Sequence, residues 1–95
     1  MMRFRHRGLK RLFERDDKSA VGADMCEKIE NRLAVLDRAA KPSDMALPGF
    51  HLKPMTGDMK GYWEVVVQGN WRIVWRFEGT DVVDVDLIDP HRGHH

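Results

Sequence analysis

The stretch "GNWRIVWRF", Gly69 to Phe77, decides the fold of this chain, because its aromatic and aliphatic residues alternate with arginines. Successive side chains of a strand point to opposite faces, so this alternation predicts a β-strand that buries its aromatic residues on one face. The other face then carries two arginines, Arg72 and Arg76. Guanidinium groups on a sheet face serve as solvated surface residues, as partners of carboxylates or as a site for phosphate. The strand alone leaves these three alternatives open.

Length and composition predict a single domain over residues 1–95, since 95 residues leave little room for a second core. The composition, 42% hydrophobic and 33% charged, is typical of a soluble globular protein. No apolar run approaches the roughly 20 residues of a membrane span, and the basic N-terminus lacks the apolar segment of a signal peptide. These features predict a cytoplasmic protein that does not contact membranes.

The net charge of +1 hides a strong asymmetry between the two ends of the chain. The first twelve residues hold no acid and five basic residues: Arg3, Arg5, Arg7, Lys10 and Arg11. The segment from Glu78 to Asp89 holds five acids and neither lysine nor arginine. A basic segment suits a polyanion or an acidic protein partner. The alternative is that the two segments neutralise each other across adjacent strands, and both can be true.

The order of elements predicts an α+β domain in which two N-terminal helices pack on one face of an antiparallel sheet. The sheet is expected to combine an N-terminal strand at residues 3–7 with C-terminal strands at 62–68, 71–77 and 82–88. The first helix is expected at residues 9–15 and a longer one at 22–41. The apolar face of the longer helix follows helical spacing: Cys26, Ile29, Leu33, Leu36 and Ala40. Pro42 ends that helix, and a short extended piece is expected around residues 51–53 of the irregular connection.

The last hairpin poses a question of register. A two-residue loop at Gly79-Thr80 would pair Phe77 with Val82 and bring Asp84 onto the buried face. A three-residue loop, residues 79–81, would instead set Asp84 opposite Arg76 on the other face. Because a one-residue slip would bury two aspartates, we expect the three-residue loop. Arg76 then becomes a structural partner of a carboxylate, whereas Arg72 has no acid directly opposite on the last strand and is left available.

Side chains suited to phosphate chemistry gather where the last strand ends, in "LIDPHRGHH". Asp89 and His91 follow that strand and lie at the same end of the sheet as Arg72, with Lys53 and Lys60 as nearby cations. An arginine stabilises charge that develops on phosphate, and a histidine exchanges a proton near neutral pH. This set suits the cleavage of a phosphodiester without a metal.

Other chemistries find less support in the sequence. Cys26 is the only cysteine, which excludes an internal disulfide and a cysteine-based zinc site, and we expect it to pack in the core. Asp89 with the terminal histidines, His91, His94 and His95, has the composition of a metal site, but a chain terminus holds ligands poorly. Neither a glycine-rich phosphate loop nor a serine nucleophile motif occurs. We therefore expect no metal and no cofactor.

Three segments carry a resemblance: "FRHRGLKRLFE", "LPGFHLKPMTGDMKGYWEVVVQGNWRIVWRFEG" and "DVDLIDPH". They resemble the HigB-type toxins, the plasmid-maintenance killer proteins of the RelE/ParE toxin superfamily, over nearly the whole chain. The resemblance implies an α+β fold and a toxin that enters the ribosomal A site and cleaves the mRNA there. The 2′-hydroxyl attacks the adjacent phosphate and no metal is required. The implied partners are a HigA-like helix-turn-helix antitoxin, the ribosome with its mRNA, and operator DNA reached through the antitoxin.

The resemblance assigns roles to three residues that match the family. Arg72 stands for the arginine of the family's Asn-Trp-Arg and would steady the scissile phosphate. Asp89 and His91 match the outer residues of the family's terminal Asp-Tyr-His, so both are expected in the catalytic set. Pro90 stands where the family has a tyrosine that could stack on a base.

Two further positions depart from the family. Lys53 and Thr56 stand where the family has a histidine and a lysine. Lys53 can contact phosphate, so it stays in the expected catalytic set, but an unperturbed lysine is a poor general base at neutral pH. His51 would point the same way as Lys53 in an extended segment and could substitute. With Thr56 and Lys60, His51 is expected to contact RNA.

The basic N-terminal segment is expected to contact ribosomal RNA through Lys10 and Arg11, with an ordinary exposed helix face as the alternative. Two readings compete with the ribosomal nuclease. One is a non-enzymatic inhibitor of a protein target, as the ParE branch inhibits DNA gyrase. The other is a degenerate toxin that mainly binds its antitoxin and tunes repression of the operon.

Overall fold

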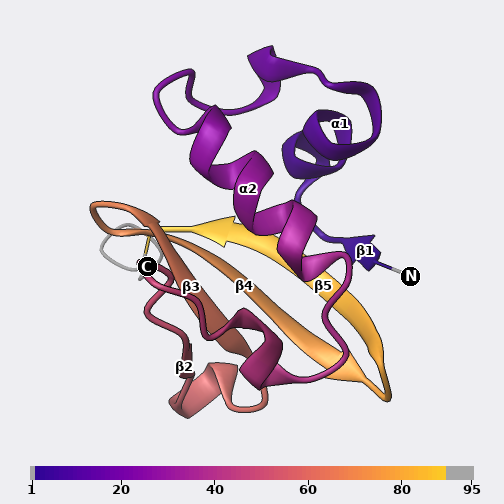
Figure 1. Cartoon of the computed structure of the whole chain (residues 1–95), viewed down its shortest axis with the longest axis vertical. Coiled ribbons are helices and arrows are strands. Elements are labelled where there is room, and N and C mark those ends of the chain that lie inside the picture. The colour runs from indigo at the N-terminus through magenta and orange to yellow at the C-terminus, as the bar shows by residue number, and fades with distance from the viewer. Residues whose placement is uncertain (1, 90–95) are drawn as a thin grey trace.

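The structure, a computed structural model, describes residues 2–89 and has the predicted α+β architecture (Figure 1). The strands are β1 (Met2–Phe4), β2 (Lys53–Pro54), β3 (Trp63–Gln68), β4 (Trp71–Glu78) and β5 (Asp81–Ile88), and the helices are α1 (Arg7–Arg15) and α2 (Cys26–Leu36). Short 3-10 turns lie at Lys18–Ala20, Pro42–Met45 and Gly57–Met59. Both helices lie on the same side of the sheet, as the sequence predicted.

The sheet has the order β1-β5-β4-β3-β2, and it differs from the prediction at both edges. The prediction that the N-terminal strand joins an antiparallel sheet is wrong in orientation, because β1 pairs with β5 in parallel. The short extended piece expected near residue 53 is a fifth strand, β2, which pairs antiparallel with β3. The strand at the N-terminus is also shorter than predicted. The backbone amides of Arg5 and His6 both donate to the carbonyl of Val85, and the chain then turns into α1.

The start of α1 is fixed by its cap. The imidazole Nδ1 of His6 accepts a hydrogen bond of 3.1 Å from the amide of Leu9, so one orphan amide of the first turn is satisfied. Arg7 therefore belongs to the helix and not to the strand predicted at residues 3–7. Leu9 and Leu12 of α1 are buried against the sheet.

The apolar face of α2 is confirmed for Cys26, Ile29, Leu33 and Leu36, all of which are buried. The prediction that Ala40 continues this face is wrong, because the helix ends at Leu36 and Ala40 is exposed. The carboxylate of Asp44 accepts the amides of Ala40 and Lys41 at 2.9 and 3.2 Å, which draws the chain out of the helical path. Those hydrogen bonds hold the pKa of Asp44 below its ordinary range.

Each of the two C-terminal hairpins combines a two-residue turn with a one-residue bulge. The three-residue loop predicted for the last hairpin is wrong, because Glu78 pairs with Asp81 and Phe77 with Val82. A register shift between Val74 and Arg76 then restores the predicted pairing of Ile73 with Leu87. Asp84 occupies this bulge with a left-handed φ of 55°. The aspartate therefore leaves the core face without the longer loop.

The β3–β4 hairpin also has a two-residue turn followed by a one-residue bulge. Its turn has Gly69 at the first position with φ 55°, the conformation that glycine adopts without steric cost in such turns. Gln68 pairs with Trp71, and a shift follows between Val66 and Gln68. The displaced backbone groups of Val66 find partners outside the hairpin, since its amide donates to Phe50 at 2.7 Å and its carbonyl accepts from Arg32 at 3.0 Å.

We expect Gly8→Ala to destabilise the fold. Alanine normally stabilises a helix relative to glycine, but a Cβ at Gly8 would lie 2.6 Å from the carbonyl oxygen of Ala20. Relieving that overlap should lower the free energy of unfolding by about 1–3 kcal/mol, measured by chemical denaturation. Glu27→Ala on the exposed face of α2 is the control and should change it by less than about 0.5 kcal/mol. An unchanged or higher stability of Gly8→Ala would contradict the close approach.

Candidate active site

The candidate site lies on the face of the sheet that the helices leave uncovered, which we call the open face. Side chains of β3 and β4 alternate, so Trp63, Val65, Ile73 and Trp75 pack toward the helices. The residues that alternate with these four point to the open face, together with the residues that pair with them on the adjacent strands. Its charged and polar members include Lys53, Tyr62, Glu64, Arg72, Arg76, Asp84 and Asp86, the last of which pairs with Val74.

Arg72 is held on the open face by contacts on two of its nitrogens. Its Nε donates to Glu64 Oε2 at 3.0 Å. Its Nη1 donates to the carbonyls of Gly69 at 2.8 Å and Trp71 at 3.1 Å, both at the β3–β4 turn. The prediction that Arg72 faces Ile88 on the last strand, with no acid opposite, is confirmed. The prediction that Arg72 is therefore left available is wrong, because Glu64 binds it. Its partner comes from β3 instead.

Glu64 is the site residue that the sequence prediction missed. It is 5% exposed and is the one charged residue classed as buried among residues 2–89. Alternation within Tyr62-Trp63-Glu64-Val65 could have placed it on the face of the arginines. A two-residue turn without a bulge would, however, have set it opposite Trp75, on the core face. The bulge, which sequence alone did not reveal, sets it opposite Val74 and beside Arg72.

Of the other predicted catalytic residues, the structure places Lys53 and Asp89 relative to Arg72 and Glu64. Lys53 pairs with Glu64 across β2 and β3, which places both on the same face, and Lys53 is exposed. Asp89 directly follows Ile88, the strand partner of Arg72, so it lies at the predicted end of the sheet. His91 lies outside the described residues.

The structure does not support the prediction that His51 points the same way as Lys53. The prediction required an extended backbone, but His51 has a left-handed φ of 50°. The strict alternation that would have aimed both side chains the same way is therefore absent at this position. His51 is exposed and directly follows Phe50, whose carbonyl is tied to Val66.

Thr56 and Lys60 lie together, but at a distance along the sheet from Arg72. They line an open pocket of about 500 Å³ with residues of the β2–β3 connection, among them Pro54, Tyr62 and Trp63. Tyr62 and Trp63 begin β3, whereas Arg72 pairs with Val66 near its other end. The structure therefore groups Thr56 with Lys60 and separates both from the arginine.

Arg76 has the structural role that the sequence predicted. Its Nε donates to Asp84 at 2.7 Å and its Nη2 donates to Glu78 at 3.0 Å. These hydrogen bonds, led by the one to Asp84, raise the pKa of Arg76. From the N-terminal segment, Arg3 contacts Glu78 at 2.9 Å and Arg5 lies 3.8 Å from Asp84. Part of the basic segment is thus neutralised by the acidic one, as the alternative interpretation proposed.

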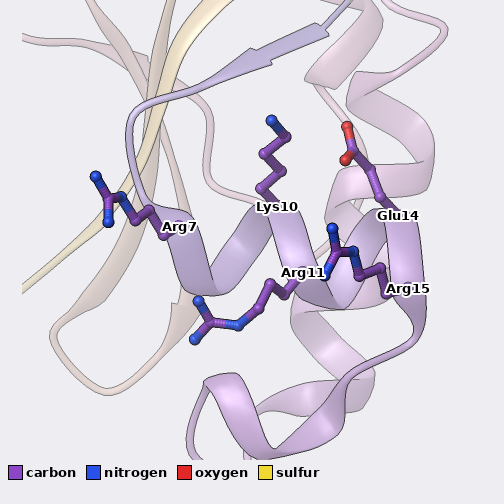
Figure 2. A pocket seen from close by; sticks show the side chains of 5 residues that line it. All are labelled: Arg7, Lys10, Arg11, Glu14 and Arg15. Atoms are coloured by element: carbon purple, nitrogen blue, oxygen red, sulfur yellow. The ribbon is translucent and has the colours of Figure 1, made fainter.

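The remaining basic side chains form a separate surface on α1. Arg7, Lys10, Arg11 and Arg15, with Glu14 among them, line a shallow pocket of about 290 Å³ (Figure 2). Arg11 also contacts Asp17 at 3.5 Å. Because α1 covers the core face of the sheet, Lys10 and Arg11 are not brought together with Arg72. They belong to a second basic surface, on the helical side of the molecule.

Within residues 2–89, no cluster of three or more histidine, cysteine, aspartate or glutamate side chains has the arrangement of a metal site. The tail histidines of the sequence analysis lie outside that range. None of the helices described is long and apolar enough to cross a membrane. Cys26 is buried and its thiol donates to the carbonyl of Lys18, so it packs as predicted.

Two helices on one face of a small, mostly antiparallel sheet are the fold of the RelE/ParE-like toxins. The structure is similar to that of the YoeB/ParE toxin from Agrobacterium tumefaciens, with a TM-score of 0.52 and 25% sequence identity over 77% of this chain and 84% of that one.

The chain belongs to the HigB-like toxin family, RelE-like toxins of the type II toxin–antitoxin system HigB, which matches residues 2–91. It is 36% identical over 88 residues to the endoribonuclease HigB of Proteus vulgaris, across 93% of this chain and 96% of the relative. The chain is therefore a toxin of a type II toxin–antitoxin system and a homologue of an endoribonuclease.

We expect the stabilising effect of Asp84 to depend on pH. The hydrogen bond from Arg76, with smaller contributions from Arg5 and Tyr62, lowers the pKa of the Asp84 carboxyl in the folded protein. A carboxyl with a lowered pKa stabilises the fold above its unfolded pKa and loses that effect as the pH falls through its folded pKa. Asp84→Asn should therefore lower the Tm at pH 7, and the difference from wild type should shrink below a pH of about 4.

Thermal unfolding followed by circular dichroism between pH 7 and pH 2 measures this effect. Asparagine also tolerates the left-handed backbone of the bulge, so the substitution removes the charge and spares the turn. Asp58→Asn in an exposed turn is the control and should leave the Tm unchanged at every pH. A Tm difference for Asp84→Asn that stays constant down to pH 2 would refute the electrostatic account.

Proposed function

We propose that this toxin is a ribosome-dependent endoribonuclease that cleaves mRNA in the ribosomal A site and thereby inhibits translation. The observation that supports it is the arrangement at one end of the open face. There Arg72 is oriented by two sets of contacts, Lys53 faces Glu64, and Asp89 follows the strand partner of Arg72. The relative from Proteus vulgaris is itself an endoribonuclease, which agrees with phosphodiester chemistry at this site.

The proposed reaction is transesterification by the RNA itself. The 2′-oxygen forms a bond to the adjacent phosphorus, the bond from phosphorus to the 5′-oxygen breaks, and a 2′,3′-cyclic phosphate and a 5′-hydroxyl result. One proton leaves the 2′-hydroxyl for solvent, and His91 is the proposed donor of the proton that reaches the departing 5′-oxygen. Arg72 stabilises the charge on the phosphate oxygens, with Lys53 as the second cation and Asp89 beside it. This scheme requires neither a metal nor a cofactor.

The proposed partners follow from the family and from the second basic surface. A HigA-like helix-turn-helix antitoxin would neutralise the toxin and carry it to operator DNA, and the toxin would act in the cytoplasm. Lys10 and Arg11 on α1 would contact ribosomal RNA while the open face receives the mRNA. Thr56 and Lys60, which line the pocket at the β2–β3 connection, and the exposed His51 would contact the mRNA strand.

Substitution of Arg72 tests the proposed reaction directly. Primer extension on a reporter mRNA, after induction of the toxin without antitoxin, should show cuts that depend on translation. Arg72→Ala and His91→Ala should each lower cleavage by about 10²–10³-fold, the usual cost of losing a group that stabilises the transition state or transfers its proton. Arg72→Lys keeps a cation for Glu64, so its loss of cleavage would not reflect an unpaired buried charge.

Arg76→Lys is the matched control, because it alters the structural arginine of the same strand and should preserve the cuts. Toxicity without mRNA cuts would contradict the nuclease and indicate a protein target such as DNA gyrase. No effect on growth would indicate a degenerate toxin that mainly binds its antitoxin.

The second basic surface makes its own prediction. Lys10→Glu with Arg11→Glu should weaken binding to ribosomes, and the affinity of the variant should depend less steeply on salt, because fewer phosphates are neutralised. Sedimentation with ribosomes at several salt concentrations measures both quantities. Lys28→Glu with Arg38→Glu reverses two exposed charges elsewhere, the same change in net charge, and should have little effect. Equal losses in the two variants would mean that net charge, and not this surface, governs binding.

A further inference from the structure

Glu64 is the group on the open face whose burial is hardest to explain by stability. The carboxylate loses its hydration inside the sheet, and replacing a buried ion pair by apolar residues is often neutral or even stabilising. The two carboxylates that bind Arg76 avoid this cost, since the Asp84 side chain is 32% exposed and that of Glu78 is 52% exposed. The Glu64 side chain is 7% exposed.

The contacts of Glu64 suggest what its burial achieves. It accepts a hydrogen bond from Nε of Arg72, while the carbonyls of Gly69 and Trp71 accept from Nη1. A planar guanidinium that is bonded at two of its nitrogens, from two directions, cannot rotate about its last torsions without breaking one set. The Arg72 side chain is itself 21% exposed, so the fixed group still reaches the surface of the open face.

Charge balance on the open face gives Glu64 a second role. Lys53 is the cross-strand neighbour of Glu64 on β2, whereas Arg72 lies on β4 at the other side of β3. The buried carboxylate therefore lowers the net positive charge of this part of the open face. It is poorly placed to take a proton from a ribose hydroxyl, because it is almost fully covered and one of its oxygens is bonded to Arg72.

We propose that Glu64 is a positioning residue, which fixes the guanidinium of Arg72 in the orientation that meets the scissile phosphate. The inference rests on the proposed function, because it takes Arg72 to be the phosphate-binding group. Glu64 itself touches neither the RNA nor the reacting atoms and acts through Arg72.

The first arm of the test measures cleavage of mRNA on programmed ribosomes at increasing toxin concentration. Glu64→Ala should lower the maximal rate by about 100-fold, the cost of misplacing a catalytic group by about 1 Å. The half-saturating toxin concentration should stay near the wild-type value, because Lys10 and Arg11 are untouched. Glu64→Gln keeps an acceptor for Nε of Arg72 and should fall between Glu64→Ala and wild type. Glu78→Gln is the matched control and should cleave as wild type.

A double-mutant cycle separates positioning from an independent effect. Once Arg72 is alanine, nothing remains for Glu64 to position, so Glu64→Ala with Arg72→Ala should be as slow as Arg72→Ala alone. Thermal unfolding of every variant confirms that it is folded, and the nearly isosteric Glu64→Gln keeps the test usable if Glu64→Ala does not fold. Losses that multiply in the double variant would overturn the proposal.

The second arm does not depend on catalysis. The Nε–Hε signal of Arg72 in ¹H–¹⁵N NMR spectra, assigned by its absence in Arg72→Lys, should be protected from exchange in the wild type. It should lose that protection in Glu64→Ala. If the wild type fails to cleave, the proposed function fails, and this signal alone decides whether Glu64 fixes Arg72.

Two results would overturn the positioning role. One is wild-type cleavage by Glu64→Ala, and the other is an Arg72 signal that is indifferent to residue 64. A Glu64→Gln variant as inactive as Glu64→Ala, with the Arg72 signal unchanged, would show instead that Glu64 acts directly on the RNA.

Discussion

The arrangement of the open face depends on one constraint, the register in which the strands of the two C-terminal hairpins pair. Side chains alternate with a period of two, so a tight turn fixes which residues share a face, and a shift of one residue exchanges the faces. Two-residue turns alone would have brought Glu64 and Asp84 onto the face of the helices. One bulge in each hairpin reverses that outcome, at the cost of a left-handed backbone at Asp84. The apolar core and the charged open face are thus both consequences of the same two insertions.

The bulges also decide how the two arginines differ. Arg76 lies in an exposed network that joins β4, β5 and the N-terminal segment through Glu78 and Asp84, and solvent screens such pairs. Arg72 instead donates hydrogen bonds to a buried carboxylate and to carbonyls at the β3–β4 turn. The first arrangement stabilises the sheet, and the second presents a group of fixed orientation. The question that "GNWRIVWRF" raised is therefore answered by the neighbours of each arginine, since the side chains themselves are chemically identical.

Sequence patterns predicted what depends on local periodicity. The three C-terminal strands and the apolar face of α2 from Cys26 to Leu36 follow from alternation and helical spacing, and the structure confirms them. The partnership of Arg76 with Asp84 is also confirmed, although it arises from a bulge and not from the three-residue loop from which it was predicted. The features that sequence patterns did not predict depend on tertiary hydrogen bonds. The parallel orientation of β1 rests on pairing with β5 across the length of the chain, and the early end of α2 on the carboxylate of Asp44. The pairing of Glu64 with Arg72 required the bulge. At the bulge Val66 bonds the backbone carbonyl of Phe50 and the side chain of Arg32, and no local pattern contains these partners.

Charge arithmetic at the site shows why a buried carboxylate suits a nuclease that has lysine at position 53. Lys53 and Arg72 carry two positive charges, and Glu64 and Asp89 carry two negative charges, so these four residues have no net charge. They therefore provide little net attraction for the single negative charge of a phosphodiester in the ground state. In the proposed reaction the attacking 2′-oxygen adds a second negative charge, and catalysis requires stabilisation that grows at that moment. A protonated His91 would supply the additional positive charge, and its proton would leave with the 5′-oxygen. In this scheme Glu64 would prevent the resting site from binding RNA phosphates too strongly, so that the site would favour the more negatively charged transition state.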